Sequence, residues 1–142
     1  TIMDTNDNVL FNHTFNTKLV DWWYSELNGI KPENTYSEKP FESYKDEIQS
    51  IFNDVSRLIT FNASNFFLEK QGITIPTNTA VEDLADPFRV LGDANDTIDN
   101  LCAYYGYPLS DNIYNRTGVD YAKAVNYCRH EMDRYIKAQE SK

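Results

Sequence analysis

One long stripe of apolar residues dominates the hydrophobic pattern of this chain. From Phe41 onward, apolar residues recur in steps of three and four, which is the period of one helix face. The stripe consists of Phe41, Tyr44, Ile48, Ile51, Phe52, Val55, Leu58, Ile59, Ala63, Phe66 and Phe67. Gly72 follows where a helix C-terminus is expected. The pattern predicts a single helix over residues 41–71, about 45 Å long, which needs partner helices to cover its apolar side.

Three shorter patterns predict the rest of the fold. A polar tail over residues 1–8 is expected to be flexible, and a first helix is predicted over residues 9–28. A third helical region over residues 80–105 begins with a capping box at Thr79–Glu82, restarts at Asp86–Pro87 and stops at Gly106. The last helix begins at Thr117 and runs to about Gln139. Its apolar stripe consists of Tyr121, Val125, Cys128, Met132, Tyr135 and Ile136.

Together these patterns predict an all-α fold. Residues 1–142 form a single domain, a bundle of about four helices with one long central helix over residues 41–71. With 41% hydrophobic and 14% aromatic residues, the chain can bury a sizeable core and is too apolar for a disordered protein. Part of the long stripe could also pair with a second copy of the chain.

The charge of the chain limits its partners. The formal net charge is −9, and residues 1–111 carry 7 basic against 18 acidic residues. A field of this sign repels phosphate, which argues against direct binding of nucleic acid. No apolar run approaches 18 residues, so membrane insertion is not expected either. An acidic surface favours a partner protein with a basic surface.

Four carboxylates in the third helical region suggest a binding surface. On one continuous helix, Glu82, Asp86, Asp93 and Asp96 would lie within about 80° of each other, opposite the apolar stripe. Such an acidic ridge could bind a basic protein surface or, less readily, a divalent cation. The alternative is an ordinary solvated helix face.

Consecutive aromatic residues form a second candidate surface. Trp22, Trp23 and Tyr24 diverge by about 100° per residue on a helix, so they cannot all face one core. At least one is therefore expected at the surface or in an interface, where Trp and Tyr often anchor partners. Tyr104–Tyr107 is a similar group. The alternative is that both Trp side chains wedge against flanking helices.

No pattern typical of catalysis is present in the sequence. The inner stripes carry no paired acids for magnesium chemistry, and the spacings typical of zinc sites, phosphate loops and nucleophile elbows are missing. Cys128 and His130 stand two apart on a predicted helix and point in different directions, so they cannot form a nucleophile pair. No enzyme activity, cofactor or metal is therefore expected.

The start of the chain and its two cysteines leave the compartment open. If Met3 is the native start, the protein is cytoplasmic; if Thr1 follows a removed signal peptide, it is secreted or periplasmic. Cys102 and Cys128 both lie on apolar stripes, where free thiols pack well. A simple hairpin of the two helices would place them at different heights, against a disulfide, although an extra turn within residues 108–116 could remove the mismatch.

The leading hypothesis is a non-enzymatic protein-binding module that occludes or caps a partner. In a generic way the chain resembles small acidic helical proteins that bind other proteins, such as bacterial immunity proteins and phage-encoded inhibitors. The high Asn, Tyr and Ile content is typical of AT-rich bacterial or viral genomes. Two alternatives are a secreted or surface protein with a structural role and a Cys102–Cys128 disulfide, and a carboxylate-dependent helical enzyme.

Overall fold

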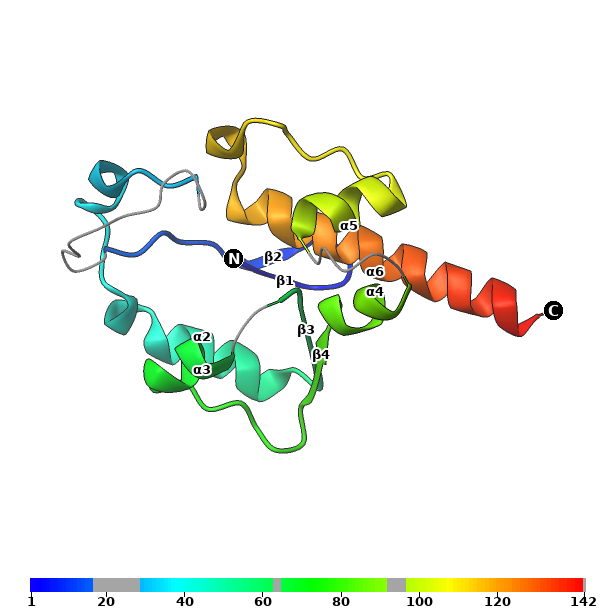
Figure 1. Ribbon diagram of the computed structural model, residues 1–142. Helices are drawn as coiled ribbons and strands as arrows, with labels where there is room; N and C mark the ends of the chain where they lie inside the picture. Colours follow the sequence, from blue (N-terminus) through cyan, green and yellow to red (C-terminus); the bar gives the residue numbers. More distant parts are fainter. Residues whose placement is uncertain (17–28, 63–64, 92–96, 142) are drawn as a thin grey trace.

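The fold mixes helices with two small sheets (Figure 1). The computed structural model describes residues 1–16, 29–62, 65–91 and 97–141. In these ranges the α-helices are α2 (Lys45–Asp54), α3 (Asn65–Lys70), α4 (Ala85–Leu91), α5 (Ile98–Tyr105) and α6 (Gly118–Glu140). The strands are β1 (Ile2–Met3), β2 (Val9–Phe11), β3 (Arg57–Thr60) and β4 (Ala80–Asp83). The prediction of an all-α bundle is therefore wrong.

The predicted central helix over residues 41–71 is broken into three elements. A 3₁₀ turn, η2 (Phe41–Ser43), leads into α2, which ends at Asp54 because Val55 is extended, with φ −99° and ψ 137°. Val55, Ile59 and Thr60 are β-branched and favour the strand that follows. Asn62 then takes a left-handed conformation, with φ 50°, and ends the strand.

The segment after this break returns to pair with it. β3 and β4 run parallel, in register from Arg57 opposite Ala80 to Thr60 opposite Asp83. Parallel neighbours need a long crossover, and residues 61–79 supply it with α3 inside it. The predicted capping box at Thr79–Glu82 is wrong because these residues lead into and form β4. Asp83 instead turns the chain from β4 into α4, since its Oδ1 accepts the backbone N–H of Ala85 at 2.9 Å.

The N-terminal region also departs from the predicted helix over residues 9–28. Residues 9–11 form β2, which pairs antiparallel with β1, so residues 2–3 of the expected tail are part of a sheet. Asp4 turns the chain back, because its Oδ1 accepts the backbone N–H groups of Asn6 at 2.8 Å and Asn8 at 2.9 Å. Residues 17–28 lie outside the described part of the chain.

The end of α5 and both ends of α6 lie close to their predicted positions, whereas the start of α5 at Ile98 was not predicted. Gly106 ends α5 in the left-handed conformation, with φ 75°. Thr117 and Asp120 form a capping box at the start of α6, which confirms the predicted helix over residues 117–139 to within one residue. A further 3₁₀ turn, η3 (Ile113–Asn115), lies in the connection between α5 and α6.

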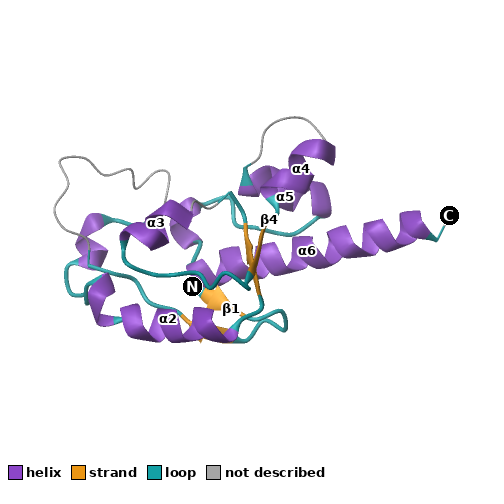
Figure 2. Ribbon diagram, turned by 90° about the horizontal axis from the view of Figure 1, so that it is seen from below, coloured by secondary structure: helices purple, strands orange, loops and turns teal. Residues whose placement is uncertain are grey.

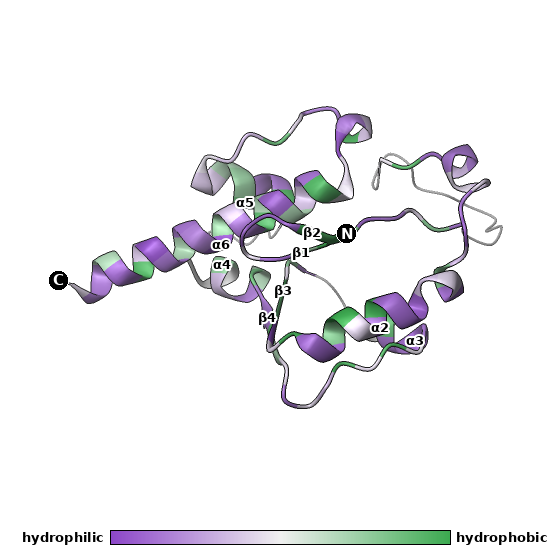
Figure 3. Cartoon of the chain, turned by 180° about the vertical axis from the view of Figure 1, so that it is seen from behind, coloured by the Kyte–Doolittle hydropathy of each residue, from purple (hydrophilic) through white to green (hydrophobic). Residues whose placement is uncertain are grey.

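The core consists of two hydrophobic clusters, and the helices that contribute to them lie on opposite sides of the N-terminal strands (Figure 1, Figure 2). The first is built by α4, α5 and α6, with Leu84, Phe88, Leu101, Cys128 and Met132 buried. The second is built by β2, α2 and the segment after α3, with Phe11, Ile48, Phe52 and Ile73 buried. Figure 3 shows apolar residues along β1 and β2, between the two clusters.

Two side chains of α6 contact the turn between β1 and β2. Asn126 Nδ2 donates to the backbone oxygen of Asp4 at 2.8 Å and to Oδ1 of Asp7 at 2.9 Å. One helical turn further on, His130 Nε2 lies 3.3 Å from the backbone oxygen of Thr5. These contacts join residues more than a hundred positions apart.

Replacing Asn126 by leucine is expected to release this turn. The loss of two hydrogen bonds should lower the free energy of unfolding by about 1–3 kcal/mol and accelerate amide hydrogen exchange in residues 4–8. Lys123→Leu, nearly one turn earlier on the same helix, is the control and should leave exchange in the turn unchanged. Equal exchange in both variants would show that Asn126 does not hold the turn.

Candidate functional site

The apolar stripe of α6 continues beyond the core. Cys128 and Met132 are buried, and Tyr135 and Ile136 follow on the same side of the helix but are 51% and 52% exposed. Both ribbon views show the C-terminal end of α6 extending past α4 and α5 (Figure 1, Figure 2). The reason is length: α5 has 8 residues, about 12 Å, against 23 residues, about 34 Å, for α6.

Aromatic rings from α4 and α5 extend this exposed stripe. Tyr104 is 58% exposed and packs edge-to-face on Phe88, with ring centroids 5.8 Å apart, and on Tyr105, at 4.9 Å. Burial, together with the neighbouring Tyr104, Cys128, Tyr135 and Glu131, raises the pKa of Tyr105 to about 12. Tyr105, the last residue of α5, is partly buried against the cluster that contains Cys128 and Met132 of α6. We call Tyr104, Tyr105, Tyr135 and Ile136 the tyrosine surface.

The tyrosine surface is suited to binding rather than to chemistry. The raised pKa keeps the hydroxyl of Tyr105 protonated at neutral pH, so it is not a base. Glu131 is paired with Arg134 at 3.0 Å along the same helix. Exposed tyrosines offer a large apolar area with a polar tip and lose little side-chain entropy on binding. Such a surface can bury area against another protein.

The predicted acidic ridge does not lie on one helix. Glu82 is in β4, whereas Asp86 is exposed in the first turn of α4 and has its own interaction. Asp93 and Asp96 are outside the described residues. The geometry assumed for Glu82 is wrong, because a strand and not a helix carries it.

Glu82 is instead the centre of a charge network that links β3, β4 and α6. It forms ion pairs with Arg57 and, at 3.1 Å, with Arg129, which also pairs with Asp133. The side chain of Arg129 is only 14% exposed. Burial opposes its charge, but the hydrogen bond to Asp133 and the charge of Glu82 outweigh this and raise the pKa of Arg129. The charge of Glu82 is therefore used within the fold.

The predicted aromatic anchors Trp22, Trp23 and Tyr24 lie outside the described residues. The second aromatic group, Tyr104–Tyr107, is described, and Tyr104 and Tyr105 belong to the tyrosine surface. Tyr135 and Ile136 were assigned to the core stripe of the last helix by the sequence pattern. The mismatch between a short α5 and a long α6 is the signal that identifies them as surface residues.

Cys102 and Cys128 meet across the interface of α5 and α6. Both are buried and free, each affects the pKa of the other, and Cys128 Sγ lies 4.0 Å from the backbone oxygen of Leu101. Burial raises both pKa values, that of Cys128 to about 12. The two helices bring the cysteines together although a simple hairpin would not. The connection between the helices contains η3, an extra turn within residues 108–116.

The described ranges of the chain bury few groups that could carry catalysis. In these ranges no carboxylate is buried at a helix interface, and the buried polar residue is Thr35, a threonine. No group of three or more His, Cys, Asp or Glu side chains in these ranges could hold a metal ion. Nor is any described helix long and apolar enough to cross a membrane.

Comparisons with protein-family models, with curated proteins and with solved structures find no match to this chain. The likeness to immunity proteins and phage inhibitors depended on an all-helical bundle. The mixed fold with its two small sheets removes that basis. This interpretation is therefore wrong.

Proposed function

We propose that this protein is a non-enzymatic protein-binding module that contacts its partner through the tyrosine surface. The observation that carries the proposal is the exposure of Tyr104, Tyr135 and Ile136 in continuity with a buried core. Residues of this kind usually anchor interfaces when they adjoin a rigid core. Met132 and Cys128 supply that rigid support one and two turns away on α6.

The charge of the chain indicates what kind of partner fits. A protein with net charge −9 attracts a basic surface over a distance of several ångströms at physiological salt. Association with such a partner would be faster at low ionic strength. The acidic residues would steer the partner, while the tyrosine surface supplies the buried area.

The decisive experiment compares two tyrosines with matched exposure. Tyr104 is 58% exposed and Tyr36, far from the tyrosine surface along the chain, is 63% exposed. A partner captured by the native chain should bind the Tyr104→Ser variant about tenfold more weakly or worse, and the Tyr36→Ser variant unchanged. Calorimetric or surface-binding titration at two salt concentrations measures both effects.

A second variant distinguishes the loss of a binding contact from a loss of folding. Ile136→Ser removes an exposed side chain from the projecting end of α6 and should weaken binding in the same way. Thermal unfolding of each variant serves as the control for stability. Equal affinities of the Tyr104, Ile136 and Tyr36 variants, or the absence of any captured partner, would overturn the proposal.

A further inference from the structure

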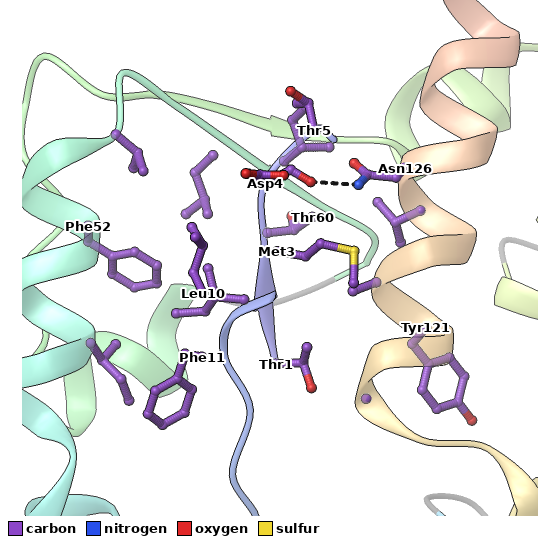
Figure 4. A pocket seen from close by; sticks show the side chains of 18 of the residues that line it. Thr1, Met3, Asp4, Thr5, Leu10, Phe11, Phe52, Thr60, Tyr121 and Asn126 are labelled. Atoms are coloured by element: carbon purple, nitrogen blue, oxygen red, sulfur yellow. Dashed lines mark hydrogen bonds between the residues drawn. The ribbon is translucent and has the colours of Figure 1, made fainter. Parts of the chain in front are cut away.

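A hollow of about 830 Å³ separates the two hydrophobic clusters. Its walls are formed by β1, β2, the C-terminal half of α2, β3 and the first turns of α6. Figure 4 shows Phe52 on one side, Tyr121 on the other and Met3 between them, reaching toward α6. This volume is within the range of about 300–1,000 Å³ that is usual for small-molecule sites.

The walls of the hollow are mainly apolar. Phe11 and Phe52 come from one cluster, and Ile59, Phe61 and Val125 border the other. Protein interiors are normally packed without such spaces, because unfilled apolar walls lose dispersion contacts. An apolar molecule between the clusters would restore those contacts. The walls come from separate elements of irregular shape, which favours a flexible aliphatic chain over a rigid ring system.

The charges around the hollow indicate which polar head group fits. Arg57 lines it but is paired with Glu82. Asp4 also lines it, and hydrogen bonds from Asn8 and Asn6 hold its pKa below the ordinary value, so that the carboxylate is charged.

Asp54 is the group best placed to receive a ligand charge. It lines the hollow as the last residue of α2, where the helix dipole is negative. Its carboxylate has no ion pair within the described part of the chain. A negative helix end and an unpaired carboxylate together favour a cation.

We propose that the hollow binds a single-chain amphiphile, with an aliphatic tail between the two clusters and a protonated amine head beside Asp54. The tail would contact the partly buried apolar side chains of the walls, among them Ile59, Phe61 and Val125. The head would replace water at a negative edge of the hollow. This site is separate from the tyrosine surface and does not depend on the proposed function.

The test uses displacement of the neutral apolar dye N-phenyl-1-naphthylamine by straight-chain alkylamines, alkanols and alkyl carboxylates, all below their micelle concentrations. Amine affinity should rise about fourfold per added methylene until the hollow is full, and then level off. Amines should bind about fivefold more tightly than alkanols of the same length. Carboxylates should bind most weakly.

Matched variants locate the head and the tail. Asp54→Asn should abolish the preference for amines over alkanols, whereas Asp46→Asn, with the same charge change at the other end of α2 and outside the lining, should retain it. Ala122→Phe should place an aromatic ring inside the hollow and weaken every ligand at least about tenfold. Ala103→Phe, exposed on α5, should have no effect.

Each outcome of this experiment decides the proposal. Length-dependent amine binding that Ala122→Phe removes and Ala103→Phe does not would support it. Absence of dye and amine binding, equal binding by both alanine variants, or tighter binding of carboxylates than of amines would overturn it. Loss of partner binding by the Tyr104→Ser variant has no bearing on this result.

Discussion

In the native protein, alkylation of Cys128 by iodoacetamide is expected to be slower than in the unfolded chain by a factor on the order of 10³. Alkylation of Cys102 should also be slower, because burial raises its pKa too. The reactive species is the thiolate. At about pH 8 roughly a quarter of an unfolded thiol is ionised, because its pKa is about 8.5. Burial raises the pKa of Cys128 to about 12, so only about one molecule in 10⁴ carries the thiolate there.

The difference in pKa also predicts how the alkylation rates of the native and unfolded chains change with pH. As pH rises from about 7 to 9, the alkylation rate of the unfolded chain should increase and then level off. The rate of the native protein should continue to rise toward pH 12, because the folded pKa of Cys128 is the higher one. Mass spectrometry at timed intervals measures both rates. Rapid labelling of the native protein, or a Cys102–Cys128 disulfide in freshly purified material, would contradict two buried free thiols.

Replacing Leu101 by alanine is expected to lower the free energy of unfolding by about 2–5 kcal/mol. Leu101 is fully buried on α5 and belongs to the cluster with Leu84, Phe88, Cys128 and Met132. Its removal leaves a cavity between α5 and α6 that the surrounding helices can only partly close. Urea denaturation followed by circular dichroism measures the change.

Leu10 offers a chemically matched control for this measurement. It is an exposed leucine in β2, and Leu10→Ala should change the free energy of unfolding by less than about 1 kcal/mol. A similar loss in both variants would mean that α5 and α6 do not form a tightly packed core. The tyrosine surface would then lack its rigid support.

The predicted central helix was wrong for an identifiable physical reason. The doublet Leu58 and Ile59 satisfies a helical step of three or four and also provides alternate faces of a strand. The choice depends on β4, whose residues pair with β3 from 23 positions away. Hydrophobic periodicity describes one segment at a time and contains no information about such a partner. The same limitation turned Thr79–Glu82 into a predicted helix start.

Only part of the tyrosine surface could be predicted from the sequence. Tyr104 and Tyr105 stand out as consecutive aromatics that cannot both face one core. Tyr135 and Ile136 continue an apolar stripe and therefore look like core residues. Only the short length of α5 leaves them without cover.

The local features of this protein follow from the types of neighbouring residues along the chain. The capping box at Thr117, the stop at Gly106 and the extent of α6 depend on interactions within about four residues, so they follow directly from residue types. The tertiary structure alone decided the pairing of β3 with β4, the contact of Cys102 with Cys128 and the exposure of Ile136. These features depend on partners more than twenty residues away, or on the lengths of neighbouring helices, and therefore on the packing of the whole chain.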